Sequence, residues 1–133
     1  MTIVDSNVLI DVFSRDPSWF GWSTRALARQ TELGRIGIVD IIFAEVSISF
    51  PHWTDVEQAL AALSVERLTM SASALHVAGH AFKQYRSAGG PRTTVLPDFL
   101  IGAQAQVAGL PILTRDVRRY ASYFPTVELI APG

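Results

Sequence analysis

The sequence contains no cysteine, which excludes disulfide bonds, thiolate catalysis and zinc–thiolate sites. No uninterrupted apolar run approaches the ~18 residues that a membrane-spanning helix needs. The longest apolar-rich stretch, IGIVDIIFAEVSISF, contains Asp40 and Glu45. The amino terminus also lacks a basic segment followed by a long apolar segment, which argues against a secretory signal peptide. These absences predict a soluble cytoplasmic protein with no membrane association.

Lysine is nearly absent as well. The eleven basic residues are ten arginines and Lys83. Arginine forms bidentate contacts with phosphate groups, so this bias is compatible with phosphate recognition. A GC-rich genome would produce the same bias without any functional cause. The net charge of −1 does not by itself indicate a nucleic-acid-binding protein.

What the chain does contain is an alternation of short apolar strands and helix-length segments. Strands are predicted at residues 2–4, 35–39, 65–68, 110–114 and 126–130. Helices are predicted at residues 6–13, 18–33, 40–50, 54–63, 71–90 and 98–109, with a loop at 92–97 and a short helix or turn within 115–125. The 133 residues are expected to form one α/β domain, residues 1–133, with a parallel sheet covered on both faces.

Three aspartates fall where a predicted strand ends or a helix begins. Asp5 follows the first strand, Asp98 opens a helix, and Asp116 follows the fourth strand. Each has a simpler interpretation as a helix N-cap, and for Asp98 taken alone this interpretation is the better one. Asp5 is not needed as a cap, because Ser6 or Asn7 could serve equally well. Ligands of parallel sheets bind at the carboxyl ends of the strands, which is where Asp5 is expected.

Glu45 differs from the other acids because it lies inside an apolar helix, in the segment FAEVS. A glutamate is rarely buried unless it is paired or coordinates a ligand. The structural alternative is a buried ion pair with Arg25 or Arg29. We consider a functional site the better interpretation.

If these four carboxylates converge, their mutual repulsion raises their pKa values, and a divalent cation would relieve it. Mg²⁺ and Mn²⁺ prefer oxygen ligands, so the pattern indicates metal-assisted hydrolysis of phosphodiester bonds. The remaining eight acids and eleven bases leave a positive balance that suits an RNA enzyme. The other acids, Asp11 among them, are expected in exposed or capping positions. His76 and His80 share a helix face and are interpreted as surface or interface residues.

The segments IVDSNVLID, FAEVS, LPDFLIGAQAQVAGLPILTRD and YFPTVELIAP together resemble a PIN domain of the VapC toxin type, from type II toxin–antitoxin systems. The resemblance covers essentially the whole chain. It implies a PIN-like three-layer sandwich with a central parallel sheet of four to five strands. It also implies a Mg²⁺- or Mn²⁺-dependent endoribonuclease, a cognate antitoxin that neutralises it, and an RNA substrate. A homodimer is also expected.

The resemblance also implies roles for individual residues. Asp5, Glu45, Asp98 and Asp116 match the acids that form the metal pocket of this family. Asn7 and Thr114 match the polar residues that support it.

The chain departs from the family pattern in two places. Some members carry a further acid after the last aspartate, but here the segment reads TRDVRRYASYF. A second metal ion would therefore be held less well, and Arg115, Arg118 and Arg119 are expected to contact RNA phosphate instead. Gly102 occupies a position where alanine is common, and this difference is expected to matter little.

Three aromatic residues, Trp19, Phe20 and Trp22, crowd the start of a predicted helix. All three cannot face one core, and exposed aromatics are favoured anchors at interfaces. They are predicted to form part of a groove that binds an antitoxin helix. The alternative is that they close the core beneath the first helix.

Two other functions are alternatives to the ribonuclease. A phosphatase with an aspartyl nucleophile at Asp5 would need an acid two residues later and a lysine near the phosphate. The chain has Asn7 at the first position, and Lys83 lies within a helix, so this class is disfavoured. A non-catalytic PIN-like module that binds RNA or a protein remains the main alternative, although the complete set of acids argues against it.

Overall fold

A five-stranded parallel sheet with the strand order β3-β2-β1-β4-β5 forms the centre of the molecule. The computed structural model describes residues 1–91 and 95–133. The strands are β1 (Thr2–Val4), β2 (Ile36–Ile38), β3 (Val65–Arg67), β4 (Ile112–Leu113) and β5 (Leu129–Ile130). The helices are α1 (Ser6–Ser14), α2 (Phe20–Leu33), α3 (Asp40–Ser47), α4 (Trp53–Ala62), α5 (Ala72–Ser87), α6 (Leu96–Ala108) and α7 (Arg118–Tyr123). The predicted α/β sandwich with a parallel sheet is confirmed.

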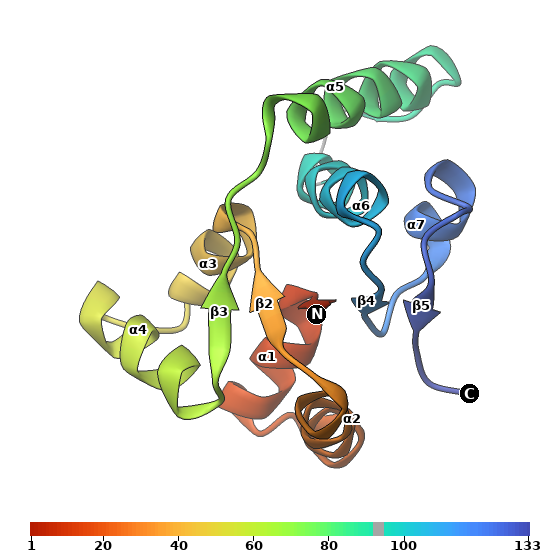
Figure 1. Cartoon of the computed structure of the whole chain (residues 1–133). Coiled ribbons are helices and arrows are strands. Elements are labelled where there is room, and N and C mark those ends of the chain that lie inside the picture. Colours follow the sequence, from red (N-terminus) through yellow and green to blue (C-terminus); the bar gives the residue numbers. More distant parts are fainter. Residues whose placement is uncertain (92–94) are drawn as a thin grey trace.

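The helices form two groups that cover the two faces of the sheet. Helices α1 and α3 contact each other, and they also pack on α2 and α4. Helices α5 and α6 lie side by side at the top of Figure 1, and α7 packs against α6. The chain runs from β1 outward to β3 and then returns to β4 on the other side of β1, so right-handed crossovers place the two groups on opposite faces. No helix of the described residues combines the length and apolar character needed to span a bilayer.

The reversal of strand order falls between β1 and β4, and this position determines where a site can form. All three residues of β1 are buried, as are both residues of β4, because helices cover these central strands on both faces. Val4 and Leu113 are register partners at the ends of the two strands. The chains diverge beyond them, which opens a crevice at the carboxyl ends of the strands.

The residues that cap α1 and α6 differ from those that the sequence predicted. Helix α6 begins at Leu96, with Pro97 in its first turn, so Asp98 lies inside the helix and is not its N-cap. The loop predicted at 92–97 therefore ends earlier than expected, and its residues 92–94 lie outside the described residues. Asp5 does cap α1, because its Oδ1 accepts a hydrogen bond from the backbone N–H of Ser6 at 2.8 Å.

Gly102 was expected to matter little, and the structure corrects this. The residue is buried in α6 against Phe124, and a methyl group at its Cα would overlap the phenyl ring. Phe124 is itself almost fully buried and cannot move aside without disturbing α7. The glycine is therefore required for the close approach of α6 to the segment that follows α7.

This contact gives a prediction for stability. Gly102→Ala should lower the free energy of unfolding by about 1–3 kcal/mol, because overpacking a rigid core forces side chains from their rotamers. Gly79→Ala is the matched control, since Gly79 lies on the exposed face of α5 with no atom near its missing methyl group. That control should gain up to ~1 kcal/mol from helix propensity. Equal urea midpoints for wild type and Gly102→Ala would contradict the packing argument.

Candidate active site

Asp5 lies at the switch point between β1 and β4 and is almost completely buried. Both of its oxygens accept hydrogen bonds. Oδ1 accepts from the backbone of Ser6, and Oδ2 accepts from the Thr114 hydroxyl at 2.8 Å and the Tyr120 hydroxyl at 2.9 Å. Burial raises the pKa of Asp5 even though these three bonds favour its charged form. The carboxylate is therefore fixed in place and carries a charge that the protein only partly compensates.

Glu45 and Asp98 reach the same region from the two helix groups. Glu45 is half-buried on α3, and its pKa is raised by burial and further by the charge of Asp5. A side-chain hydrogen bond with Ser6 opposes this shift. Within residues 1–91 and 95–133, Glu45 has no ion-pair partner, so the predicted alternative of a salt bridge to Arg25 or Arg29 is wrong.

The pKa of Asp98 is raised to about 6. Burial is the largest cause, and the charges of Asp5 and Glu45 add to it. Arg119 opposes the shift, with its Nη1 lying 3.3 Å from Asp98 Oδ2. The charge of Asp5 thus raises the pKa values of both Glu45 and Asp98 at the carboxyl ends of the strands, and Arg119 opposes the shift of Asp98.

Asp116 behaves differently from these three acids. Its side chain is about half exposed, and the guanidinium of Arg118 makes hydrogen bonds of 2.9 and 3.1 Å to its two oxygens. The hydrogen bonds from Arg118 lower the pKa of Asp116, although its charge still raises that of Asp5. The structure therefore gathers Asp5, Glu45 and Asp98, and it places Asp116 at the rim.

Asn7 and Thr114, the two residues predicted to support the site, are joined to Asp5 and to each other by hydrogen bonds. The Thr114 hydroxyl is fully buried, donates to Asp5 and accepts from Asn7 Nδ2 at 3.2 Å. It also accepts from the backbone N–H of Asp116 at 3.1 Å. The Asn7 carbonyl oxygen accepts from the backbone of Arg115 at 3.2 Å. These bonds connect the start of α1 to the segment after β4 and fix both halves of the crevice.

The three carboxylates offer the oxygen ligands that Mg²⁺ and Mn²⁺ prefer. Across residues 1–91 and 95–133, no three Asp, Glu or His side chains are placed to ligate one ion together. Mg²⁺ is commonly held by one or two carboxylates and keeps several waters. One or two of the three carboxylates would be enough to hold such a partly hydrated ion.

Two residues of the site were missed by the sequence analysis. Tyr120 is almost fully buried on α7 and donates to Asp5 over a separation of 115 residues, and no local pattern signals this contact. Asp11 was expected to be exposed or capping, but it is 2% exposed. It accepts hydrogen bonds from Ser23 and, in a bidentate pair, from Arg115 at 2.6 and 2.9 Å.

The Asp11–Arg115 pair connects α1 to the segment that carries Asp116. The guanidinium of Arg115 also lies 4.9 Å from the ring centre of Trp19, a cation–π contact. Asp11→Asn should lower the free energy of unfolding by about 1–3 kcal/mol, because it leaves a largely buried arginine without its counter-charge. The double variant Asp11→Asn/Arg115→Gln should lose less free energy of unfolding than the two single variants lose together.

Urea denaturation of the single and double variants measures this coupling. The exposed ion pair between Arg35 and Glu66 provides the control, and Glu66→Gln should change stability far less. Strict additivity of the Asp11 and Arg115 substitutions would contradict a structural role for their pair.

The three predicted arginines differ in how their side chains are engaged. Arg115 is committed to Asp11 and Trp19, so its predicted contact with RNA is not supported by its position. Arg118 and Arg119 border a hollow of about 230 Å³ that is also lined by Tyr85 and Ser122. This hollow adjoins Asp98 and Asp116 through the two ion pairs.

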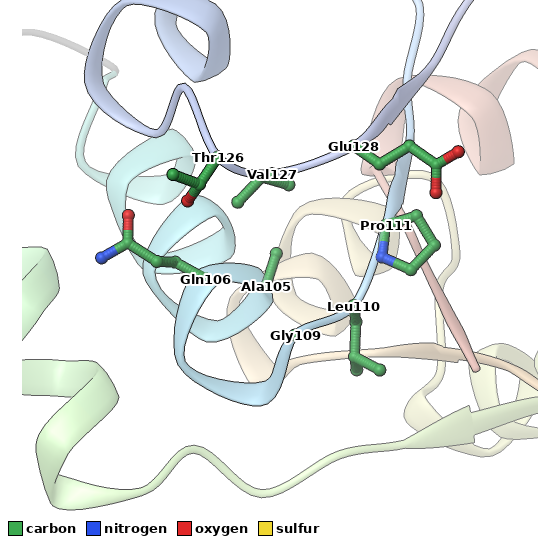
Figure 2. Close-up of a pocket in the computed structure, with 8 residues that line it drawn as sticks. All are labelled: Ala105, Gln106, Gly109, Leu110, Pro111, Thr126, Val127 and Glu128. Atoms are coloured by element: carbon green, nitrogen blue, oxygen red, sulfur yellow. The ribbon is translucent and has the colours of Figure 1, made fainter.

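A second hollow lies at the amino ends of β4 and β5, away from the acids. It has a volume of about 160 Å³ and is lined by residues that precede β4 and β5, including Pro111 and Glu128. Figure 2 shows Gln106 and Glu128 on opposite sides of it, pointing away from each other. Glu128 is the one titratable residue among those that line it, so this hollow lacks the group of titratable side chains that a catalytic site needs.

The aromatic segment is divided between core and surface. Trp22 packs against the core and makes an edge-to-face contact with Trp19 at 6.1 Å. Trp19 is half-buried beneath Arg115, whereas Phe20 is 37% exposed. Phe20 lies on the same face of α2 as Thr24 and Leu27, which line a hollow of about 370 Å³ between α1, α2 and the end of α4. Of the three aromatics, Phe20 is the most exposed.

Comparison with known proteins agrees with this architecture. The family model of the PIN domain matches residues 2–123. No curated protein sequence matches the chain.

Several solved structures are similar in fold. The VapBC2 structure of Rickettsia felis, bound to a promoter DNA fragment, has a TM-score of 0.71 and 16% identity, with 99% of this chain and 98% of that chain covered. A toxin–antitoxin complex from Klebsiella pneumoniae has a TM-score of 0.65 and 24% identity, with coverages of 96% and 95%. DNA-bound VapBC from Salmonella typhimurium has a TM-score of 0.70 and 17% identity, with coverages of 98% and 96%. At these identities the similarity shows a shared fold.

Proposed function

Because this chain belongs to the PIN domain family, we propose that it is the ribonuclease toxin of a VapBC-type toxin–antitoxin pair. The observation that carries this proposal is the group formed by Asp5, Glu45 and Asp98 at the switch point of the sheet. Their raised pKa values mark a site where uncompensated negative charge is concentrated, as in many catalytic centres.

In this proposal, Asp5 and Asp98 hold a Mg²⁺ or Mn²⁺ ion, and Glu45 and Asp116 complete its surroundings through water. When bound, the ion lowers the pKa of a water molecule and offsets charge on the phosphate. Thr114 and Tyr120 keep Asp5 oriented by donating to its Oδ2. Asn7 holds the loop after β4 through the backbone of Arg115.

Glu45 is the best candidate for accepting the proton of the attacking water. The oxygens of Asp5 already accept three hydrogen bonds from the protein, and Asp98 is paired with Arg119. Glu45 lacks a cationic partner among the described residues, and its raised pKa brings it nearer to neutral pH, which suits a general base.

The hollow beside the acids provides the predicted path for RNA. Arg118 and Arg119 would exchange their carboxylate partners for phosphate oxygens when a cation compensates Asp116 and Asp98. The ring of Tyr85 lies below Arg119, 5.7 Å from its guanidinium carbon, and offers a face on which a base can stack. Nothing in this arrangement reads base edges, so substrate choice is expected to depend on RNA shape.

The experiment that tests this function is RNA cleavage by the purified chain. The protein should cut mixed RNA in millimolar Mg²⁺ or Mn²⁺, stop cutting when EDTA is added, and recover when the ion is restored. RNA binding without cleavage under any of these conditions would support the alternative of a non-catalytic module. That alternative is favoured by one observation, the pairing of Asp98 and Asp116 with arginines that occupy the pocket.

The antitoxin is proposed to place an apolar helix along α2. Phe20→Ala should weaken antitoxin binding by about tenfold or more, because exposed aromatics dominate such interfaces. It should leave RNA cleavage unchanged, since Phe20 lies on a helix that contributes no acid to the site. Titration of labelled antitoxin into each variant measures the affinity.

Trp22→Ala is the informative comparison for the aromatic segment. It should destabilise the fold because Trp22 packs against the core. An unchanged antitoxin affinity for a folded Phe20→Ala protein would remove α2 from the interface.

The homodimer also remains a proposal. Ile48 and Trp53, which flank the connection between α3 and α4, are 87% and 68% exposed. Large exposed apolar side chains are typical of association surfaces. Light scattering on Ile48→Asp should show a shift toward monomer if this connection lies in the dimer interface.

A further inference from the structure

Helix α5 carries two histidines that lie outside the carboxylate pocket and have no part in the proposed function. His76 and His80 are one helical turn apart, and both are exposed. The opposite face of α5 is fixed by packing, with Ala78 buried and Phe82 in edge-to-face contact with Phe99 of α6. This packing holds α5 in an orientation that presents both imidazoles to solvent.

The two imidazoles have the spacing of a chelating pair. Their Nε2 atoms are 3.1 Å apart, and their ring centres are 4.3 Å apart. Imidazole nitrogens bind transition metals at ~2.0–2.1 Å. Two nitrogens at that distance from one ion lie 3.1 Å apart when the angle at the metal is about 100°, between the right angle of square-planar sites and the tetrahedral angle.

We infer that His76 and His80 form a binding site for one divalent transition-metal ion, of the class Ni²⁺, Cu²⁺ or Zn²⁺. Imidazole favours these ions, whereas the carboxylates of the pocket favour Mg²⁺ and Mn²⁺. The two sites therefore differ in ligand chemistry, and the histidine variants distinguish them. Two protein ligands leave coordination positions open to water or to a donor atom of another molecule.

Metal binding at this site would also act on the fold. The ion would join two successive turns of α5, and it would bind only when these turns are helical. Binding therefore stabilises the folded state, by an amount that rises with the logarithm of the ion concentration once the site is saturated. Because α5 packs against α6, the stabilised helix lies beside the helix that carries Asp98.

The test is isothermal titration of NiCl₂ into the full chain, produced without a histidine tag, in millimolar Mg²⁺ to occupy the carboxylates. Wild type should bind one equivalent of Ni²⁺. His76→Gln and His80→Gln should each weaken binding by at least about tenfold. Even the loss of a residue that only hydrogen-bonds to a metal ligand lowers metal affinity by about tenfold or more. His52→Gln is the matched control, because His52 is the third histidine, is exposed and lies before α4.

Three results would overturn the inference: no binding by wild type, equal binding by the His76→Gln and wild-type proteins, or an equal loss in His52→Gln. The 3.1 Å separation would then reflect only a hydrogen bond between the two rings. A second measurement uses Cu²⁺, whose electron spin echo modulation should show two coordinated imidazoles in wild type and one in each single variant.

Discussion

The Asp98→Asn protein will fold and will cleave RNA about a thousand-fold more slowly than wild type. The substitution keeps the size of the side chain and removes the charge that would help to hold the cation. A bound metal contributes several kcal/mol of charge stabilisation in the transition state, and each 1.36 kcal/mol corresponds to about tenfold in rate. Single-turnover cleavage of a labelled RNA in saturating Mn²⁺ measures the effect.

Glu57→Gln is the control for this experiment. Glu57 is exposed on α4, and its replacement makes the same change in net charge at a distance from the pocket. Its cleavage rate should equal that of wild type. Cleavage by Asp98→Asn within a few-fold of wild type would remove Asp98 from the site.

The second large effect concerns stability in the absence of metal. At pH 7.5 in EDTA, Asp98→Asn should be more stable than wild type by about 1–3 kcal/mol. The pKa of Asp98 is about 6 in the folded protein, against 3.8 for an ordinary aspartate, so ionisation of this group opposes folding. The lower end of the range allows for solvent screening, since the side chain is 32% exposed.

The sign of this effect fixes its pH dependence. Because the folded pKa is raised, the contribution of Asp98 to stability is fully present below pH 4 and is lost as the pH rises through 6. The advantage of Asp98→Asn should therefore vanish at pH 4. Adding Mn²⁺ at pH 7.5 should stabilise wild type and reverse the order of the two proteins. A constant stability difference from pH 4 to 7.5 would contradict the raised pKa.

Much of the fold follows from local sequence patterns. The strands are short, apolar and separated by helix-length segments, so their positions in the sequence and their parallel arrangement could be predicted. The strand-end position of Asp5 and the apolar surroundings of Glu45 identified both as unusual. The hydrogen bond from Tyr120 to Asp5 could not be predicted, because it depends on how α7 packs against the sheet.

The failures have physical causes that are equally specific. The sequence pattern places the start of this helix at Asp98, which makes the acid a possible N-cap. Proline favours the first turn of a helix, and Pro97 indeed lies in the first turn of α6. Asp11 lies in the apolar segment NVLIDVF, and the argument applied to Glu45 would have identified it as a buried, paired acid. The need for glycine at residue 102 depends on the ring of Phe124, whose position no local pattern reveals.

The most direct test of the central claim is a crystal structure of the wild-type chain soaked in MnCl₂, with data collected to detect anomalous scattering. We expect one strong anomalous peak beside Asp5 and Asp98, with Glu45 facing it directly or through water. The same soak of Asp98→Asn crystals should leave this position empty. An empty pocket in wild-type crystals at saturating Mn²⁺, with Arg119 still paired to Asp98, would contradict the assignment of these carboxylates as a metal-dependent nuclease site.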